Sequence, residues 1–482
     1  MPPRAPARPL GALILAAGQG KRMRSDRIKL LHVLAGAPMV CHVARAAFEL
    51  KPALVAAVVG TQADDVIAAL TGIGPAGGIR FVTQERQLGT AHAVLQAEPL
   101  WKGGRPGRRD LLILNGDVPL IRPSTLRALL RHHRRTGASA TVLTTIVADP
   151  SGYGRVVRGA SGALAGVVED RDASAAQKHI REVNAGLYCV DPAVAFAALR
   201  KTRRSNAQGE YYLPDLIPIL RRQGRRVEAY LHAETEEVLG VNDRADLARA
   251  AKVLYSRRAA ELMESGVTIV DPGCTYIDPG VEVGHDTVIH PMARLEGSTT
   301  IGSGCTIGAF SHIVDSTLAD GVIVRDLCVI TKSRIAGGVS IGPFAHLRPD
   351  TVLEEEVHIG NFVEVKKSRL GRRSKANHLT YLGDAEIGER CNIGAGTITC
   401  NYDGVSKHVT TLGDEVFIGS DTQLVAPVTV GRGAYVGAGS TITKDVPEQA
   451  LALSRAQQRN IEGWVKRKQE KRERESGKEG KA

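Results

Sequence analysis

Residues 335–365 read IAGGVSIGPFAHLRPDTVLEEEVHIGNFVEV, with an aliphatic residue at every sixth position. Two further runs, one before and one after this one, have the same period. The aliphatic positions of the three runs are Ile277, Val283, Ile289, Leu295, Ile301, Ile307 and Ile313; Ile335, Ile341, Leu347, Leu353, Ile359 and Val365; and Leu412, Ile418, Leu424, Val430, Val436 and Ile442. Three strict runs at one period indicate a hexapeptide repeat.

A six-residue period has a direct structural meaning. Each hexapeptide supplies one short strand and a turn, three of them form one coil of a triangular prism, and the aliphatic residue points inward. We therefore expect a left-handed parallel β-helix with a continuous apolar column. The period slips at Asn377–Tyr381 and Thr399–Thr411. There we expect loops to leave the prism, and such loops often carry function.

The first half of the chain alternates short β-rich runs with helical stretches. Strands are predicted at Gly11–Ala16, Ala53–Val59, Leu111–Leu114, Ala140–Val147 and Gly186–Val190, and helices at Val40–Leu50 and Pro123–Arg135. This alternation predicts a parallel sheet covered by helices on both faces, which is a Rossmann-like α/β domain. Apolar residues three and four apart then predict one long helix between the two halves.

These patterns divide the chain into five segments. We expect a disordered start over 1–10, an α/β domain over 11–243, a linker helix over 244–265, the β-helix over 266–455 and a charged, disordered tail over 456–482. The tail cannot bury a core because its composition is almost entirely polar and charged. Solvation is the simplest role for it, and binding of RNA or another partner is the alternative.

Composition narrows the classes of function. The formal net charge is +12, but residues 1–29 carry seven Lys or Arg against one acid, and residues 461–482 carry eight against five. Most of the excess charge therefore lies at the two ends. Aromatic residues make up only 4% of the chain, which argues against a stacking platform for single-stranded nucleic acid. We do not expect a nucleic acid partner.

Hydropathy and cysteine usage point to the cytoplasm. The longest apolar stretch near the start, Leu10–Ala17, is far shorter than the roughly 20 residues of a membrane span, and Gly18 and Lys21 follow it instead of a cleavage site. The seven cysteines form no CxxC pair. They are expected to be reduced thiols in a cytoplasmic protein, with neither a disulfide framework nor a zinc site, and we expect no membrane partner.

A glycine-rich turn follows the first predicted strand. In Leu15–Met23, Gly18 and Gly20 would let backbone N–H groups approach a phosphate or a nucleobase edge, and Arg22 and Lys29 supply positive charge. The spacing is not that of a Walker A loop. On its own, the motif is also compatible with an ordinary turn.

Two further motifs support a nucleotide site. Gln84 and residues 87–90 offer amide and backbone groups that could read a pyrimidine edge. Asp117 follows an apolar strand, at the edge where open α/β sheets bind ligands. A carboxylate beside phosphate-binding groups suggests a Mg²⁺ ligand, although an Asp shortly before Pro119 also suits a turn.

The repeat half carries its own candidate chemistry. Arg348, Lys366 and Lys367 lie on neighbouring coils and could converge on a phosphate monoester, or they could simply keep the prism soluble. His378 lies at the first slip of the period. A histidine side chain, with an ordinary pKa of about 6.5, can accept a proton from an amine that attacks a thioester. An isolated histidine of this kind is more often structural.

Considered together, the motifs resemble one family. The resemblance extends from about Leu13 to Arg455. It includes residues 152–155, Glu169, Asn184 and residues 240–242 in the first half, and residues 378–384, 392–404 and 418–423 in the second. These stretches are similar to those of the bifunctional bacterial N-acetylglucosamine-1-phosphate uridylyltransferase/glucosamine-1-phosphate N-acetyltransferases. The resemblance implies acetyl-CoA-dependent acetylation of glucosamine-1-phosphate, followed by Mg²⁺-dependent uridylyl transfer from UTP that yields UDP-N-acetylglucosamine and pyrophosphate.

The resemblance also assigns residues to the first site. Asp117 and Asn242 would bind one or two Mg²⁺ ions, and Arg22 and Lys29 would act on the phosphates. The residues expected to contact UTP or UDP-N-acetylglucosamine are Leu15, Ala16, Ala17, Gly18, Lys29, Gln84, Gly89, Thr90, Asn115, Gly116, Asp117, Gly154, Glu169, Asn184 and Asn242.

In the second site, the resemblance makes His378 the general base. Glucosamine-1-phosphate would be held by Arg348, Lys366, Tyr381 and Asn392. Asn401 and Tyr402 would contact this sugar phosphate or acetyl-CoA, and the acetyl-CoA path would be lined by Ala395, Ser420, Ala438 and Arg455.

The sequence departs from the family pattern at three places. Lys21 stands where the family usually has Thr, Arg27-Ile28 precede Lys29 where Pro is usual, and Asn115 often appears as Tyr or His. These changes keep the positive charge and Asp117, so they bear on loop geometry and rate more than on the type of reaction.

Two alternative functions would require fewer of these residues, and the repeat also predicts an oligomeric state. A uridylyltransferase with a merely regulatory repeat domain would not need His378, and a non-enzymatic scaffold would not need Asp117 or Lys29. We expect a homotrimer, because three triangular prisms can pack in parallel about a threefold axis. Ser420 and Ala438 lie several coils from His378, which favours an acetyl-CoA pocket shared between chains.

Overall fold

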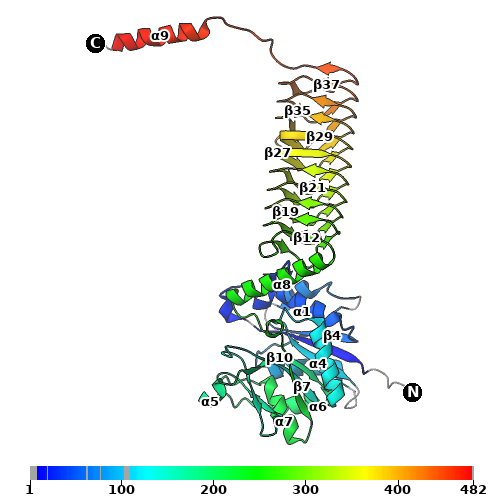
Figure 1. Ribbon diagram of the computed structural model, residues 1–482, viewed down its shortest axis with the longest axis vertical. Coiled ribbons are helices and arrows are strands. Elements are labelled where there is room, and N and C mark those ends of the chain that lie inside the picture. Colours follow the sequence, from blue (N-terminus) through cyan, green and yellow to red (C-terminus); the bar gives the residue numbers. More distant parts are fainter. Residues whose placement is uncertain (1–7, 19, 61–62, 76–77, 103–108, 480–482) are drawn as a thin grey trace, which may run out of the picture. The chain divides into compact units, whose positions relative to one another are not determined.

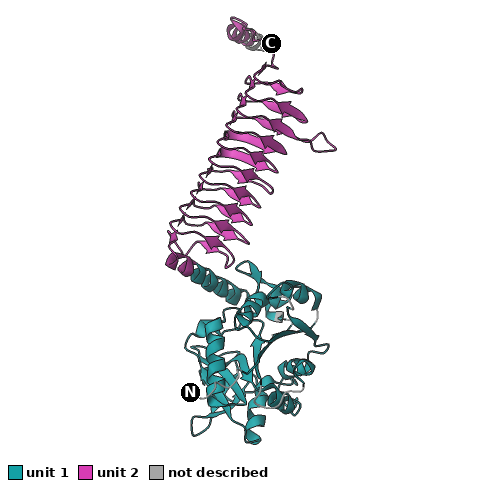
Figure 2. Ribbon diagram, turned by 90° about the vertical axis from the view of Figure 1, so that its right-hand side faces the viewer, with its two compact units in different colours: residues 1–258 teal, residues 259–482 magenta. Residues whose placement is uncertain are grey.

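The computed structural model describes residues 8–18, 20–60, 63–75, 78–102 and 109–479 (Figure 1). The chain divides into two compact units, residues 1–258 and residues 259–482 (Figure 2). Each unit has its own apolar core.

The main sheet of unit 1 has the strand order β11-β7-β10-β6-β1-β4-β5. Its strands are β1 (Leu10–Ala16), β4 (Leu54–Val59), β5 (Arg80–Thr83), β6 (Asp110–Asn115), β7 (Ala140–Ile146), β10 (Glu182–Val190) and β11 (Val227–Leu231). Strands β1, β4, β5 and β6 are mutually parallel. At their carboxyl ends, Leu15 of β1 pairs with Asn115 of β6, so the loops after these two strands emerge side by side.

The predicted parallel sheet is interrupted at β10, which runs antiparallel to both β6 and β7. A parallel return needs a crossover of a dozen or more residues, usually a helix. Between β7 and β10 the chain instead forms an antiparallel pair, β8 (Arg155–Arg158) and β9 (Leu164–Val168), and the short helix α5 (Ala175–Lys178). The alternation that suggested a parallel sheet is interrupted at this point.

Helices cover both faces of the sheet, as expected. They are α1 (Met39–Phe48), α2 (Ala63–Leu70), α3 (Thr90–Gln96), α4 (Pro123–Thr136), α6 (Pro192–Leu199) and α7 (Leu216–Arg222). Neighbouring residues of β1 point to opposite faces: Ile14 packs with residues of α1, α2 and α4, and Leu13 packs with residues of α3, α6 and α7. The hairpin β2 (Val33–Leu34) and β3 (Ala37–Pro38) precedes α1.

Helix α8 (Arg244–Glu264) connects the two units, over nearly the range predicted for the linker. Its first part is anchored on unit 1, where Ala250 is buried and Arg257 donates a hydrogen bond to the Leu120 carbonyl at 2.7 Å. Its last part belongs to unit 2, because Ala259 and Leu262 join the core of that unit.

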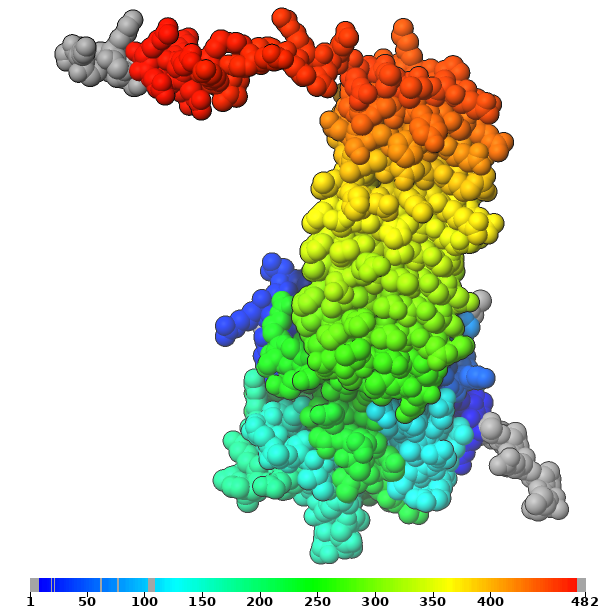
Figure 3. Space-filling view, turned by 45° about the horizontal axis from the view of Figure 1, so that its top comes forward, coloured from blue at the N-terminus to red at the C-terminus, as the bar shows by residue number. Residues whose placement is uncertain are grey.

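Unit 2 is a parallel β-helix made of short strands (Figure 1). They are β12 (Thr268–Ile269), β13 (Tyr276–Ile277), β14 (Glu282–Val283), β15 (Val288–Ile289), β16 (Arg294–Glu296), β17 (Thr300–Ile301), β18 (Thr306–Ile307), β19 (His312–Val314), β20 (Thr317–Leu318), β21 (Ile323–Val324), β22 (Val329–Thr331), β23 (Arg334–Ile335), β24 (Ser340–Ile341), β25 (His346–Leu347), β26 (Val352–Leu353), β27 (His358–Lys366), β28 (Arg369–Leu370), β29 (Lys375–Gly383), β30 (Ala385–Ile387), β31 (Asn392–Ile393), β32 (Ile398–Cys400), β33 (Thr410–Leu412), β34 (Phe417–Ile418), β35 (Gln423–Val425), β36 (Val428–Val430), β37 (Tyr435–Val436), β38 (Thr441–Ile442) and β39 (Leu451–Ala452). In the space-filling view the residues of this β-helix form one continuous column, coloured from green to orange (Figure 3). The periodic aliphatic residues are buried, apart from the half-buried Val283, which confirms the predicted apolar column.

The two stretches where loops were predicted have different structures. Ile359 pairs with Ala376, so this coil is slightly shorter than three full hexapeptides, and residues 377–381 remain inside β29. The prediction of a loop at Asn377–Tyr381 is therefore wrong. In the second stretch, Ile387 pairs with Leu412, so this coil is longer than three hexapeptides. Residues 401–409 leave the prism there as a projecting loop, as predicted (Figure 2).

One corner of the β-helix carries an exposed apolar ridge. Six residues with positive φ occupy the same position on successive coils, and each is at least 40% exposed. They are Met292, Phe310, Leu327, Phe344, Phe362 and Leu379, which we call the apolar ridge. The rings of Phe344 and Phe362 stack with centroids 5.2 Å apart. By contrast, most of the outward residues of the sheet β14–β36 are Thr, Arg or Glu.

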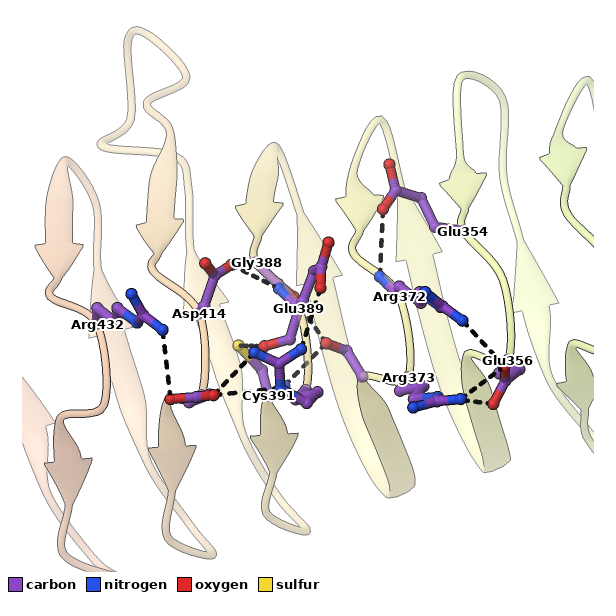
Figure 4. Close-up of polar contacts among 12 residues, drawn as sticks. Glu354, Glu356, Arg372, Arg373, Gly388, Glu389, Cys391, Asp414 and Arg432 are labelled. Carbon is purple, nitrogen blue, oxygen red and sulfur yellow. Dashed lines mark hydrogen bonds and ion pairs between the residues drawn. The ribbon is translucent and has the colours of Figure 1, made fainter.

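A second corner carries a ladder of ion pairs across successive coils (Figure 4). Arg373 pairs with Glu356 at 2.8 Å, Arg390 with Glu415 at 2.8 Å, and Arg432 with Glu415 at 3.9 Å. These side chains are about half exposed. Water screens pairs of this kind, so each contributes little to the stability of the unit.

The two ends of the chain differ from the sequence expectation. Leu10 belongs to β1, and residues 1–7 of the expected disordered start lie outside the described residues. In the tail, Trp464–Glu479 form helix α9. Lys, Arg, Glu and Gln favour a helix even where no core can form, which the prediction of disorder did not consider. None of the helices among the described residues is long and apolar enough to cross a membrane.

Candidate active sites

A cavity of about 550 Å³ opens at the carboxyl ends of β1 and β6 in unit 1. Nine of the predicted contact residues line it: Leu15, Ala17, Gly18, Lys29, Gln84, Gly89, Thr90, Asn115 and Asp117. Glu210 also lines it and was not predicted, because it lies on a loop much further along the chain. The fold therefore gathers separate motifs around one cavity.

Lys29 and Asp117, two polar residues of the cavity lining, lie beside Asn242. The Lys29 ammonium donates to Asp117 Oδ2 at 2.5 Å and to Asn242 Oδ1 at 3.5 Å, and Arg22 donates to Asn242 Oδ1 at 2.8 Å. A backbone hydrogen bond from the N–H of Val241 to the Asp117 carbonyl connects the two segments that carry Asn242 and Asp117. Two cationic side chains thus lie beside the two predicted metal ligands.

The oxygen atoms of Asp117 and Asn242 suit a hard divalent cation. Both lie within reach of one positive centre, the Lys29 ammonium, so they can share a cation. Mg²⁺ prefers one or two carboxylates supplemented by water and substrate phosphates. Among the described residues, no group of three or more His, Cys, Asp or Glu could hold a metal without such help.

The loop on the opposite wall is held by its own hydrogen bonds. The Gln84 side chain is only 3% exposed, and its amide nitrogen donates to the Gly89 carbonyl at 3.2 Å and to His92 at 2.9 Å. The Thr90 hydroxyl accepts the N–H of Leu213 at 2.9 Å. Gly89 has φ 110°, which a residue with a side chain rarely adopts. Gln84 and Thr90 therefore shape this wall, in addition to lining it.

Gly154, Glu169 and Asn184 form a second group at unit 1. The N–H of Asn184 donates to the Gly154 carbonyl at 2.8 Å, and a Cβ on Gly154 would lie 3.3 Å from Glu169 Oε1. Burial, together with the nearby charges of Asp172 and Asp215, raises the pKa of Glu169 to about 7. This carboxyl can therefore donate or accept a hydrogen bond near neutral pH.

Two predicted contact residues are not available through their side chains. Ala16 is fully buried in the core, and Gly116 is buried with its N–H donating to the Leu15 carbonyl at 3.0 Å. They hold the ends of β1 and β6 together. The motif pattern did not distinguish such support from direct contact.

In unit 2, His378 and Asn361 lie on adjacent coils in register. The Nδ1 atom of His378 donates to Asn361 Oδ1 at 2.8 Å. This bond leaves the other ring nitrogen, Nε2, as the proton acceptor. His378 is exposed, and both residues line a hollow of about 420 Å³. Asn361 was not predicted, because nothing in its local sequence marks it as a partner of a histidine on the next coil.

The residues predicted for acetyl-CoA continue the same row. Asn361, His378, Ala395, Ser420 and Ala438 each precede a residue with positive φ on successive coils. Hydrogen bonds between adjacent coils connect the row, from Asp421 N to the Ala395 carbonyl and from Gly439 N to the Ser420 carbonyl. Arg455 closes it by donating to the Ala438 carbonyl at 2.8 Å.

This row corrects one argument from the sequence. The separation of Ser420 and Ala438 from His378 by several coils was an argument in favour of a pocket shared between chains. In the structure the three residues are aligned on one side of a single β-helix. The repeat places equivalent residues of successive coils directly beside one another, although they are distant in the sequence.

A cationic cluster lies on the next face. It contains Arg348 and Lys366, as predicted, and also Lys407 from the projecting loop. Lys407 and Arg348 lower the pKa of Lys366, with Lys407 as the larger influence. Arg348 donates to Glu364 at 2.8 Å. Because three cations lie close together, an anion such as a phosphate monoester would be favoured here.

Lys407 was missed because it lies outside the repeat. Its loop is folded by Asp403, which accepts hydrogen bonds from the N–H groups of Val405 and Ser406 and from the His408 ring. These bonds lower the pKa of Asp403. Tyr402 and Lys407 pair across the loop, which returns Lys407 to the prism.

Five more residues of this region were singled out in the sequence. Tyr381 and Asn392 are partly exposed on β29 and β31. Asn401 is buried, and its amide donates to Asp384 at 2.5 Å, so it anchors the loop. Lys367 pairs with the same carboxylate at 3.5 Å and does not join Lys366. Tyr402 is exposed, and its hydroxyl donates to the Gly404 carbonyl.

Comparison with known proteins adds the family. Residues 12–184 match the model of the MobA-like NTP transferase domain, residues 271–370 the GMPPB C-terminal domain, and residues 410–444 the bacterial transferase hexapeptide of six repeats.

Three similar proteins, each named Bifunctional protein GlmU, come from Geobacillus sp. (strain WCH70), Anaeromyxobacter sp. (strain Fw109-5) and Geobacter metallireducens. They are 48%, 51% and 49% identical to this chain, and the matches cover 95%, 95% and 94% of it and 97%, 93% and 98% of their own lengths. With about half of its residues identical over nearly the full length of these relatives, the chain belongs to the family of bifunctional GlmU proteins.

Proposed function

We propose that the chain is a bifunctional enzyme of UDP-N-acetylglucosamine synthesis. Unit 2 acetylates glucosamine-1-phosphate with acetyl-CoA, and unit 1 transfers a uridylyl group from UTP to the product. The observation that carries this proposal is the presence of two independent catalytic groupings, Lys29–Asp117–Asn242 in unit 1 and His378–Asn361 in unit 2. Family membership supports both activities and implies a divalent metal ion and acetyl-CoA.

Uridylyl transfer needs no covalent enzyme intermediate. A phosphate oxygen of N-acetylglucosamine-1-phosphate attacks the α-phosphorus of UTP, the new P–O bond forms, and pyrophosphate leaves. Asp117 and Asn242 would hold Mg²⁺, which would neutralise developing phosphate charge. Arg22 and Lys29 lie beside these oxygens, where they can bind the phosphates and orient them for in-line attack.

Acetyl transfer uses the proton acceptor of unit 2. Nε2 of His378 takes a proton from the amine of glucosamine-1-phosphate as the nitrogen attacks the thioester carbonyl. A C–N bond forms, the C–S bond breaks, and the protonated His378 returns the proton to the departing thiolate of CoA. Arg348, Lys366 and Lys407 would bind the phosphate, and a backbone N–H near Ala395 would stabilise the oxyanion.

The arrangement of these groups supports a homotrimer. Leu379 of the apolar ridge, 64% exposed, stands between His378 on one face and Tyr381 on the next. In one chain the ridge therefore separates the base and the acetyl-CoA row from the cationic cluster. Packing of the ridge against neighbouring copies would bury it and would bring the base of one chain to the cationic cluster of another.

Two substitutions test whether the activities are separate. Asp117→Asn removes the charge of a metal ligand and should depress pyrophosphate release by at least about 100-fold, with CoA release unchanged. His378→Ala removes the base and should depress CoA release by about 100-fold or more, with pyrophosphate release unchanged. EDTA should act like Asp117→Asn. If either variant loses both activities while folded, two independent sites are excluded.

The same assays distinguish the bifunctional enzyme from a uridylyltransferase whose repeat domain is only regulatory. That enzyme would release pyrophosphate normally and would release no CoA from acetyl-CoA in the presence of glucosamine-1-phosphate.

A further inference from the structure

Unit 1 contains a second cavity, of about 560 Å³, which shares no lining residue with the cavity around Lys29. It lies between the segment that follows α6 and helix α7. Its polar lining includes Lys201, Arg203, Ser205, Arg222 and Gln223.

The fold concentrates positive charge at this cavity. Residues 200–204 contain four Lys or Arg, and residues 221–226 contain four Arg. The first run follows α6 and the second begins in the last turn of α7, and both contribute side chains to the lining. The outer members are neutralised, since Arg200 pairs with Glu98 and Arg226 pairs with Glu228.

The cations inside the cavity lack such partners. Among the described residues, Lys201, Arg203 and Arg222 form no ion pair, although Arg222 Nε donates to the Pro218 carbonyl at 3.2 Å. Asp215 is the single carboxylate in the lining. Burial and the neighbouring Asp172 raise its pKa, and the charge of Arg222 lowers it. One carboxylate therefore faces three cations in this lining.

We propose that this cavity binds a phosphate-bearing small anion, of the kind present in pyrophosphate and in nucleoside polyphosphates. Guanidinium groups bind phosphate oxygens through paired N–H donors, and Ser205 and Gln223 add neutral donors. The volume lies within the range of small-molecule sites. An extended nucleic acid is a poorer match because the cations line a cavity and not a long groove.

The ligand would contact a segment that also reaches the catalytic cavity. Glu210 lines that cavity, and the N–H of Ala207 donates to Asp172 Oδ1 at 2.8 Å. The second site is nevertheless defined by binding alone, so its test does not depend on either proposed activity.

Inorganic pyrophosphate, titrated into the full-length protein by calorimetry without divalent metal, is the direct probe. The titration uses a Lys29→Gln background, which weakens phosphate binding at the catalytic cavity. Adding Arg203→Gln and Arg222→Gln should weaken the remaining site by about tenfold or more, since each removes a charge-assisted contact. The control, Arg80→Gln with Arg131→Gln, removes the same charge from exposed positions elsewhere and should leave the affinity unchanged.

Equal pyrophosphate affinities in the Arg203/Arg222 variant and the Arg80/Arg131 control would overturn the proposal. Tighter binding of a single-stranded oligonucleotide than of pyrophosphate, at equal phosphate concentration, would also overturn it. If the Arg203/Arg222 variant fails to fold, amide hydrogen exchange of the Lys29→Gln protein decides the question. Pyrophosphate should then protect residues 200–223, and absence of protection there would contradict the proposal.

Discussion

At the scale of single residues, Asn361 offers the sharpest test of the acetyl-transfer site. Its Oδ1 accepts the Nδ1 proton of His378 and so fixes the ring with Nε2 free. Asn361→Leu keeps the size of the side chain but removes the acceptor, and should lower the rate of CoA release by roughly 10- to 100-fold. Asn361→Asp keeps an acceptor and should restore most of the rate.

The pH profile of acetyl transfer distinguishes positioning from simple loss of structure. Asn361→Leu should alter the profile of the maximal rate and leave the Michaelis constant for acetyl-CoA nearly unchanged. A wild-type rate in Asn361→Leu would show that His378 does not need this partner.

Glu169 gives a prediction about pH and stability. Its pKa is about 7 in the folded protein because of burial and neighbouring carboxylates, against an ordinary value of 4.5. Between these two values the folded state holds a proton that the unfolded state has lost, so stability decreases as the pH rises through this window and is constant above it. Glu169→Gln removes this effect.

We therefore compare the free energy of unfolding of Glu169→Gln with that of the natural chain. The difference, variant minus natural chain, should be larger at pH 8 than at pH 5.5 by about 2 kcal/mol. Urea unfolding, followed by the fluorescence of Trp101 in unit 1, measures it. The control is Glu49→Gln, which removes an exposed carboxylate. A gain that does not depend on pH would contradict the burial argument.

At this scale the sequence assigned residues through separate short motifs, and the roles of these residues stay predictions. Lys29, Asp117 and Asn242 were assigned from resemblance, and the structure gathers them. Asn361, Lys407 and Glu210 were missed because their relevance arises only when distant segments meet. The converse also holds, since Ala16 lies inside a motif yet is fully buried.

At the scale of elements, Gly360 connects β27 to the placement of His378. A Cβ at this position would lie 1.9 Å from the Asn377 carbonyl oxygen, which belongs to the backbone of β29. Gly360→Ala must therefore push the two strands apart beside His378. We expect CoA release to fall at least about tenfold while pyrophosphate release is unchanged, because overpacking displaces the backbone locally.

Gly337→Ala is the matched control for this substitution. Its Cβ would meet no atom closer than 3.4 Å, so it should preserve both activities. Comparison of the two variants by activity and by thermal unfolding separates a local displacement from general destabilisation. Full acetyl transfer in Gly360→Ala would mean that the strands can separate without moving His378.

The elements also show what a repeat can and cannot predict. The six-residue period gave the coils and the buried column, because inward stacking imposes that period on the sequence. A slip of the period is ambiguous, since a shortened coil and a coil extended by a loop both interrupt it. In unit 1, β10 was predicted as a strand, but its direction depends on a hairpin that local patterns do not reveal.

At the scale of the whole molecule, the unit boundary determines how the chain can be divided. A truncation near Arg249 would remove Arg257 and the buried Ala250 from unit 1. A chain ending at Arg258 keeps these contacts. It should retain pyrophosphate release and unfold at a higher urea concentration than a chain ending at Arg249, which circular dichroism can measure. Equal midpoints would show that these contacts do not stabilise unit 1.

The apolar ridge makes assembly itself testable. Six apolar side chains exposed at one corner make unfavourable contact with water, and such patches usually mark a surface that another molecule covers. Burial of a Phe or Leu side chain is worth about 1.5–3 kcal/mol. Phe310→Asp with Leu327→Asp should therefore weaken association by more than about 100-fold. Both positions lie two or more coils from His378, so any loss of acetyl transfer would result from loss of the neighbouring chain.

Light scattering and the two product assays together decide this last point. The natural chain should have the mass of three subunits, and the ridge variant the mass of one, with CoA release lost and pyrophosphate release kept. The control, Thr317→Asp with Thr411→Asp, adds the same charge to the polar sheet β14–β36 and should remain trimeric and active. A monomeric ridge variant that still releases CoA at the natural rate would mean that one chain brings the sugar phosphate past Leu379 to His378. The shared site would then be excluded.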